Sequence, residues 1–323
     1  MGFGDIKGQD RPIEILKSYL NSLKFAGAYL FTGPEGVGKR LAARTFAKAL
    51  NCLKQKEDSC DSCSSCLKIE KNNHPDIHFI GPADSEAIKI EEVRQLKQDI
   101  SLKSYEADFK VFIIDDAHKL TAEASNALLK ILEEPPAESV IILVTAKPQL
   151  LFKTIISRCQ RIKFFSLQRA SLETILKEDY RLDGALAHFL AYFCEGRIGQ
   201  TLRLKDADIL REKNRVIDMF STSPAAGLDN LARESTRQDI RRYLNLLAGW
   251  FRDIYLMKIG IAHAQLINLD RRDELLRLIH RYSWPELESI FKCISDSLGY
   301  IEQNVNTKLL LSNLKAELWK EKF

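Results

Sequence analysis

The chain has 323 residues, and 48 Lys and Arg against 44 Asp and Glu give it a net charge of +4. This length is enough for two or three domains, and 45% apolar with 28% charged residues is typical of a globular protein. So small a charge does not by itself indicate nucleic-acid binding. The sequence contains no apolar run of membrane-spanning length, no secretory signal and no complete myristoylation signal, so we expect a cytoplasmic protein without membrane contact.

The first predicted elements form a strand, a turn and a helix. Residues 10–24 have apolar side chains at helical spacing, with Asp10 as the expected N-cap. The apolar run AYLFT (28–32) predicts a buried strand, and helix-forming residues fill positions 38–50. Between them lies GPEGVGKR (33–40), which we call the glycine loop. A strand, a glycine-rich turn and a helix in this order are the context of a phosphate-binding loop.

The glycine loop has the residues of a phosphate cradle but not its usual last residue. Gly33, Gly36 and Gly38 let backbone N–H groups turn toward an anion, and Lys39 can reach the outer phosphates of a nucleotide. The next residue is normally Ser or Thr, whose hydroxyl binds Mg²⁺, but here it is Arg40, which has no acceptor atom for a metal. We therefore expect a phosphate-loop ancestry with impaired hydrolysis; the alternative is a glycine-rich turn that binds nothing.

Four cysteines follow at C-x7-C-x2-C-x2-C spacing in residues 52–66, which we call the cysteine module; they are Cys52, Cys60, Cys63 and Cys66. Four thiolates in so short a stretch can close a tetrahedral Zn²⁺ site without an open position, and such sites are structural. Free thiols, an iron–sulfur cluster and a disulfide pair are the other interpretations. A reducing compartment disfavours the disulfide, so we predict structural Zn²⁺.

Further along, apolar runs alternate with helical patterns. The predicted strands are residues 76–80, 110–115, 139–145 and 161–165. The predicted helices between them are residues 90–100 and 121–134, the second with Thr121 as N-cap. Together with the strand at 28–32, this alternation predicts a parallel five-stranded α/β sheet with helices on both faces.

Two pieces of this region have residues that suit chemistry. The strand in KVFIIDDAH (110–118) ends in Asp115, a candidate for a magnesium carboxylate, and Asp116, a candidate where a water-activating carboxylate is usually Glu. The alternative is a pair of surface acids that cap the next element. In TIISRC (154–159), Arg158 is either a solvated arginine or an arginine finger for phosphate bound to a neighbouring subunit.

After about residue 166 the strand patterns end and the sequence predicts helices only. The helical segments are residues 167–179, 184–196, 237–258 and 306–321. A turn is expected at SPAAG (223–227). The chain is thus predicted to be an α/β part followed by an all-α part.

Several of these segments together resemble bacterial clamp-loader AAA+ subunits. The resemblance rests on HPDIHFI (74–80), on the stretch IEEVRQLK to NALLKILEEPP (90–136) and on TIISRC (154–159). It covers roughly residues 5–165 and is weaker beyond, returning at NVNTKLLLSNL (304–314). The resemblance implies an AAA+ P-loop domain over residues 1–165, an all-α lid over 166–205, and an all-α collar for oligomerisation over 206–323.

The resemblance also implies roles for single residues. Motor subunits of this family hydrolyse ATP at subunit interfaces, whereas a stator-type subunit has a degenerate loop and completes a neighbour's site with the arginine of its Ser-Arg-Cys motif, here Arg158. Thr145 matches the polar sensor-1 position. Gly199 stands about where motor subunits have the sensor-2 arginine, and Arg197 is offset from that position.

The implied partners are the gamma/tau and delta clamp-loader subunits in a five-subunit ring, with the sliding clamp and primed DNA reached through the complex. Whether ATP or ADP still binds at the glycine loop stays open. Two other functions also stay open: an active ATPase motor subunit of the gamma/tau type, and a zinc-containing nucleic-acid-binding module. Arg40 counts against the first, and the small net charge counts against the second.

Overall fold

The computed structural model describes residues 1–22, 25–55, 57–82, 87–206, 208–222, 236–261, 265–302 and 305–319. It consists of two compact units. The first comprises Met1–Leu167 with Arg197–Gln200, and the second comprises Gln168–Gly196 with Thr201–Phe323. The finer division into a domain, a lid and a collar at residues 165 and 205 stays a prediction.

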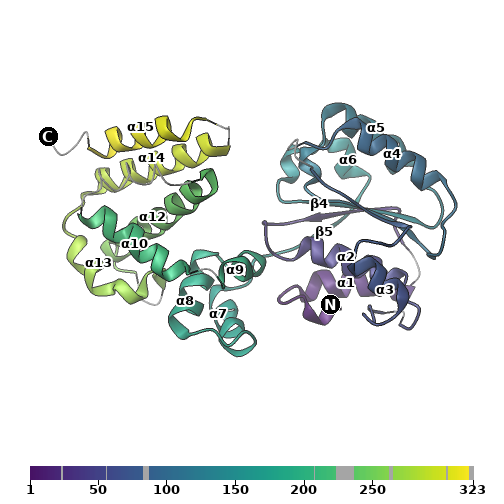
Figure 1. Ribbon diagram of the computed structural model, residues 1–323, viewed down its shortest axis with the longest axis horizontal. Helices are drawn as coiled ribbons and strands as arrows, with labels where there is room; N and C mark the ends of the chain where they lie inside the picture. The colour runs from purple at the N-terminus through teal and green to yellow at the C-terminus, as the bar shows by residue number, and fades with distance from the viewer. Residues whose placement is uncertain are drawn as a thin grey trace. The chain divides into compact units, whose positions relative to one another are not determined.

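The first unit is built on a five-stranded parallel sheet (Figure 1). Its strands are β1 (Ala28–Thr32), β2 (Ile77–Ile80), β3 (Lys110–Ile114), β4 (Ser139–Thr145) and β5 (Gln160–Lys163). The strand order is β2-β3-β4-β1-β5, so β1 lies between β4 and β5. Every residue of β1, β3 and β4 is buried, as parallel strands covered on both faces require.

Helices cover both faces of this sheet, as the alternating pattern predicted. They are α1 (Asp10–Ser22), α2 (Lys39–Leu50), α3 (Ser64–Glu70), α4 (Ile90–Ser101), α5 (Ala122–Glu133) and α6 (Lys153–Ser157). Apolar residues of α1, α2 and α3 pack with Tyr29 and Phe31 of β1. Those of α4, α5 and α6 pack with the alternate residues of the same strand, Ala28 and Leu30. The two cores follow from the two-residue period of the strand.

Several predicted boundaries differ from the structure, most of them by one to three residues. Asp10 is the first residue of α1 rather than its N-cap, and its carboxylate is one of the acidic groups that favour a helix start. The last strand ends at Lys163 rather than at residue 165, although Phe164 still donates its N–H to Thr32 O (2.7 Å). Thr121 caps α5 as predicted, because its hydroxyl accepts from the N–H of Ala124.

The second unit contains helices and no strand among its described residues. Its elements are α7 (Arg169–Glu178), α8 (Gly184–Phe193), α10 (Ile209–Thr222), α12 (Arg237–Lys258), α13 (Arg272–Leu278), α14 (Trp284–Glu302) and α15 (Thr307–Trp319). Helix α9 (Ile198–Leu204) begins in the stretch that groups with the first unit. The turn expected at 223–227 lies outside the described residues. Among the helices described, none is long and apolar enough to cross a membrane.

Candidate functional site

The glycine loop joins β1 to α2 with the backbone of a phosphate loop. Gly33, Gly36 and Gly38 all have positive φ, at 146°, 78° and 97°. L side chains rarely adopt such angles. At Gly33 the constraint is also steric, because a Cβ there would lie 2.4 Å from the carbonyl oxygen of Phe164. The sequence prediction of a tight loop between a buried strand and a helix is therefore confirmed.

Lys39 turns its ammonium group back onto this loop. Its Nζ donates to the carbonyl oxygens of Gly33 (2.7 Å) and Pro34 (2.6 Å). The residue is only 7% exposed. Burial lowers the pKa of Lys39, and the nearby Asp115 carboxylate opposes that shift. Two of the three N–H donors of the Lys39 ammonium group are thus used in hydrogen bonds to the loop itself.

Arg40 contacts the first of the two acids after β3. Its Nη1 lies 3.3 Å from Oδ2 of Asp115, and the Arg40 side chain is 59% exposed against 27% for Asp115. Burial raises the pKa of Asp115, while the Arg40 guanidinium acts in the opposite direction. The structure therefore brings together two residues that the sequence singled out separately, 75 positions apart.

The next acid and the sensor-1 candidate have partners of their own. Asp116 has φ of 50°, and its carboxylate lies 3.1 Å from Nζ of Lys119. Thr145, at the end of β4, is buried; its hydroxyl lies 3.1 Å from Nδ1 of His118 and accepts from the N–H of Lys147. Sequence reasoning did not single out His118, because only the β3–β4 pairing brings the two residues together. Burial lowers the pKa of His118.

Gly199 packs directly against the glycine loop. Its N–H donates to the carbonyl oxygen of Gly36 (2.7 Å), and a Cβ at position 199 would lie 2.8 Å from that oxygen. An arginine at position 199 could not be accommodated without moving the loop. This geometry agrees with the expected lack of a sensor-2 arginine at that position; the role of Arg197 stays a prediction.

Arg158 lies at the end of α6 with part of its guanidinium exposed. Its Nη2 lies 2.7 Å from Oε1 of Glu133, and its Nη1 donates to the carbonyl oxygen of Thr154 (3.0 Å). The side chain is 34% exposed. A guanidinium has five N–H donors, so these two contacts leave three N–H groups without a partner among the described residues. The two contacts therefore orient the guanidinium without using all of its donors.

The cysteine module gathers four thiols at one place. The Sγ atoms of Cys52, Cys60, Cys63 and Cys66 all lie within 4.8 Å of one another. Four thiolates at about 2.3 Å from a tetrahedral Zn²⁺ would be about 3.8 Å apart, so the residues present fit that ion. Hydrogen bonds from Ser62 lower the pKa of Cys60 to about 5, whereas burial raises the pKa of Cys66. The cluster can hold a metal ion, as its spacing predicted.

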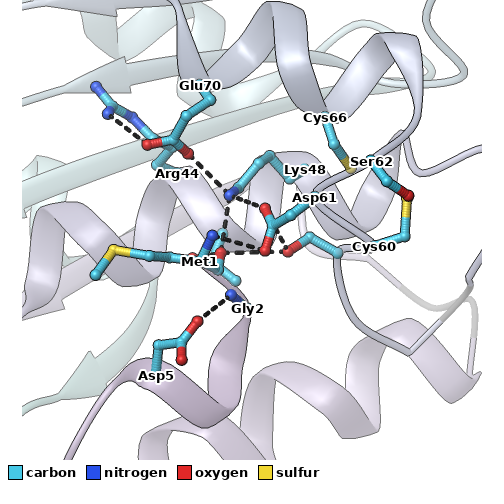
Figure 2. A network of polar contacts seen from close by, with 12 residues as sticks. Met1, Gly2, Asp5, Arg44, Lys48, Cys60, Asp61, Ser62, Cys66 and Glu70 are labelled. Atoms are coloured by element: carbon cyan, nitrogen blue, oxygen red, sulfur yellow. Dashed lines mark hydrogen bonds and ion pairs between the residues drawn. The ribbon is translucent and has the colours of Figure 1, made fainter.

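A buried lysine connects this module to α2 (Figure 2). The side chain of Lys48 is fully buried, and its Nζ contacts Asp61 Oδ1 (2.5 Å), Glu70 Oε2 (2.9 Å) and the carbonyl oxygen of Met1 (2.8 Å). Asp61 lies between the second and third cysteines, and Glu70 ends α3. Sequence reasoning missed Lys48, because only the structure shows that its neighbours in FAKAL, Ala47 and Ala49, are buried.

Comparison with known proteins agrees with these features. Residues 8–168 match the family model "DNA polymerase III, delta subunit", and residues 218–317 match its C-terminal counterpart. A delta' subunit of Bacillus subtilis is 40% identical over 53% of this chain and 51% of that protein. A tau subunit of the same organism is 34% identical over 64% of the chain and 38% of that protein. A gamma subunit of Buchnera aphidicola is 36% identical over 87% of the chain and 77% of that protein.

A glycine loop after β1, acids after β3 and a parallel sheet define the fold of a P-loop protein. Within that class, the chain belongs to the clamp-loader subunit family of DNA polymerase III. The resemblance inferred from the sequence is confirmed. The matches span about half of the Bacillus subtilis delta' subunit and about two fifths of the tau subunit.

Proposed function

We propose that this chain is a delta prime-type clamp-loader subunit that helps to load a sliding clamp onto primed DNA in replication. In this proposal it does not hydrolyse ATP itself and lends Arg158 to ATP bound by a neighbouring subunit. The observation that carries the proposal is the guanidinium of Arg158, which is oriented by Glu133 and Thr154 and keeps three N–H donors available.

The chemistry of an arginine finger explains why this geometry matters. Negative charge grows on the transferred phosphoryl group, and a guanidinium supplied in trans stabilises it. The guanidinium stabilises this charge best if it is already oriented, because no reorganisation is then needed in the transition state. Glu133 and Thr154 supply that orientation from the ends of α5 and α6.

The charges around the glycine loop support the absence of hydrolysis. Lys39 donates to loop carbonyls, Arg40 contacts Asp115, and Gly199, which stands about where motor subunits have the sensor-2 arginine, packs against Gly36. The competing candidate is an active motor subunit, which the similarity to tau and gamma subunits favours. That candidate requires Mg²⁺-dependent ATP turnover by the isolated chain, whereas our proposal expects none above background.

The proposal includes a cofactor, partners and a location. The four cysteines would hold a structural Zn²⁺, which supplies a rigid tetrahedral crosslink and no open coordination position. The partners would be gamma/tau-type and delta-type subunits in a five-membered ring, together with the sliding clamp and primed DNA. The place of action would be the cytoplasm, at the replication machinery.

The test is reconstitution with motor and delta-type subunits and a measurement of clamp- and DNA-stimulated ATP turnover. Arg158→Ala should lower turnover by about 10-fold or more, below the 10³–10⁵ known for arginine fingers of GTPases because other residues also contribute. Lys153→Ala is the matched control, since it removes an exposed cation from α6, the helix that Arg158 caps. Equal turnover by both variants in a fully assembled complex would refute the role of Arg158.

A further inference from the structure

The contact between Arg40 and Asp115 lies where a P-loop ATPase would hold its metal. Asp115 follows β3 directly, and its N–H donates to Ile80 O (2.7 Å), so the backbone fixes its place beside the sheet. Arg40 is the second residue of α2, in the position whose hydroxyl would bind Mg²⁺. One guanidinium therefore replaces the hydroxyl ligand and contacts the carboxylate ligand at 3.3 Å.

This donor set does not fit a magnesium ion. Mg²⁺ requires near-octahedral oxygen ligands at about 2.1 Å, and a guanidinium offers N–H donors only. An ion at Asp115 would have to displace Arg40 from Oδ2 or lie next to its positive charge. The other acid is engaged as well, since Asp116 contacts Lys119 at 3.1 Å.

The remaining groups of the loop agree with a site that needs no metal. In P-loop enzymes Mg²⁺ bridges phosphates whose charge the lysine also neutralises. Here Lys39 is held by Gly33 O and Pro34 O, and Gly36 O is held by the N–H of Gly199. These loop carbonyls are therefore satisfied by donors of the same unit, the Lys39 ammonium and the Gly199 N–H.

We infer that Arg40 is a built-in replacement for the magnesium ion: its guanidinium is the permanent counter-ion of Asp115 and excludes divalent cations from the glycine loop. The consequence is specific: any phosphate-bearing ligand taken up by this loop is bound independently of Mg²⁺. The inference deepens the proposed function and rests only on the part of it that concerns hydrolysis by this chain. It does not need the role of Arg158.

The experiment uses the purified full chain with ADP and Mn²⁺, a paramagnetic substitute for Mg²⁺, and follows Mn²⁺ binding by electron paramagnetic resonance. The amount of bound Mn²⁺ in a mixture of wild-type chain and ADP should be no larger than in a solution of ADP alone. Arg40→Thr restores the hydroxyl and frees Asp115, so we expect its Mn²⁺–ADP affinity to rise at least 10-fold. Because the Arg40 side chain is mostly exposed, this variant should melt within a few degrees of the wild type.

Two further variants locate the effect. Lys119→Thr removes the cation that faces Asp116 and should gain no Mn²⁺ binding. Arg40→Thr combined with Asp115→Asn should lose the gain, because the carboxylate ligand is then absent. Tight Mn²⁺–ADP binding by the wild type would overturn the inference, and so would an Arg40→Thr variant without any gain. Neither result affects the Arg158→Ala test, which is measured in the assembled complex.

Discussion

The two ends of α2 hold buried lysines in opposite ways. At the N-terminal end, Lys39 is paired with two backbone carbonyls, and burial lowers its pKa. At the C-terminal end, burial acts on Lys48 in the same direction, but the carboxylates of Asp61 and Glu70 outweigh it and raise its pKa. The helix is the same, and the difference lies in what surrounds each ammonium group.

This contrast separates a structural centre from an inherited binding loop. Lys48 has charged partners within the fold, so its burial is compensated and it connects α2 to the cysteine module. Lys39 hydrogen-bonds only to backbone carbonyls, and the more distant Asp115 carboxylate does not outweigh the effect of burial on its pKa, so its charge is less well compensated than that of Lys48. We therefore expect stability to depend on the C-terminal end of α2 and nucleotide chemistry to concern the N-terminal end only.

The largest expected effect comes from the cysteine module. If the four cysteines hold Zn²⁺, metal removal releases the loop that contains Asp61 and withdraws a partner of Lys48. The first unit should then melt about 10 °C lower, given the usual free-energy and melting-point scales. The measurements are zinc content by mass spectrometry and thermal unfolding before and after chelation.

The control for metal removal is the return of the ion. Adding Zn²⁺ back should restore the melting temperature, while Mg²⁺ should not, because thiolates select soft metals. A chain that is purified without stoichiometric metal and melts unchanged in chelator would contradict this expectation.

The next effect in size concerns Lys48 itself. Lys48→Met fits the same space but removes the hydrogen bonds to Asp61, Glu70 and Met1 O, so we expect a loss of about 2–4 kcal/mol in the free energy of unfolding. Urea unfolding, read out by hydrogen exchange of the amides of α2, measures it. The control is Lys54→Met, which removes an exposed lysine that contacts Ser62 and should cost less than about 0.5 kcal/mol.

The other end of α2 should respond much less. Lys39→Met removes an ammonium whose partners are only loop carbonyls, and those can accept from water instead. We expect a change in unfolding free energy of less than about 1 kcal/mol, measured as for Lys48→Met. If Lys39→Met lowered the free energy of unfolding as much as Lys48→Met, Lys39 would be a structural residue too. The proposed difference between the two ends of α2 would then be wrong.

The sequence predicted the parts that depend on local patterns. Buried strands such as residues 28–32, the glycine loop and the cysteine spacing depend on neighbours along the chain, and each is present. The end of β5 was misjudged because Phe164 and Phe165 continue the apolar pattern after the strand ends. Strand order was not predicted, because periodicity indicates which residues are buried but not which strands pair.

The pairs of charges could not be read from the sequence. The ion pairs Arg40–Asp115 and Arg158–Glu133 form only when separate strands and helices pack together. Lys48 looked like an ordinary helix residue, because its partners Asp61 and Glu70 follow 13 and 22 positions later in another segment. Sequence patterns thus gave the types of residue in the candidate site, and the structure added which charges neutralise one another.

The smallest expected effect is a difference in acid sensitivity. Burial raises the pKa of Asp61 in the folded state, but hydrogen bonds from Lys48 and the N-terminal ammonium outweigh it and lower that pKa; for Glu70 the hydrogen bond from Lys48 is the main cause of the lowered pKa. A lowered pKa stabilises the fold above the unfolded values, near 3.8 and 4.5, and this contribution is lost as the pH falls through the folded values. Lys48→Met should therefore lose less stability than the wild type between pH 5 and pH 3, although its free energy of unfolding is already lower at pH 7.

The comparison variant is Lys39→Met, whose free energy of unfolding should depend on pH as that of the wild type does, because the main partners of Lys39 are carbonyls that do not titrate. Urea unfolding of the three proteins across this pH range measures the slopes, and parallel curves for all three would mean that the Lys48 cluster does not set the acid response.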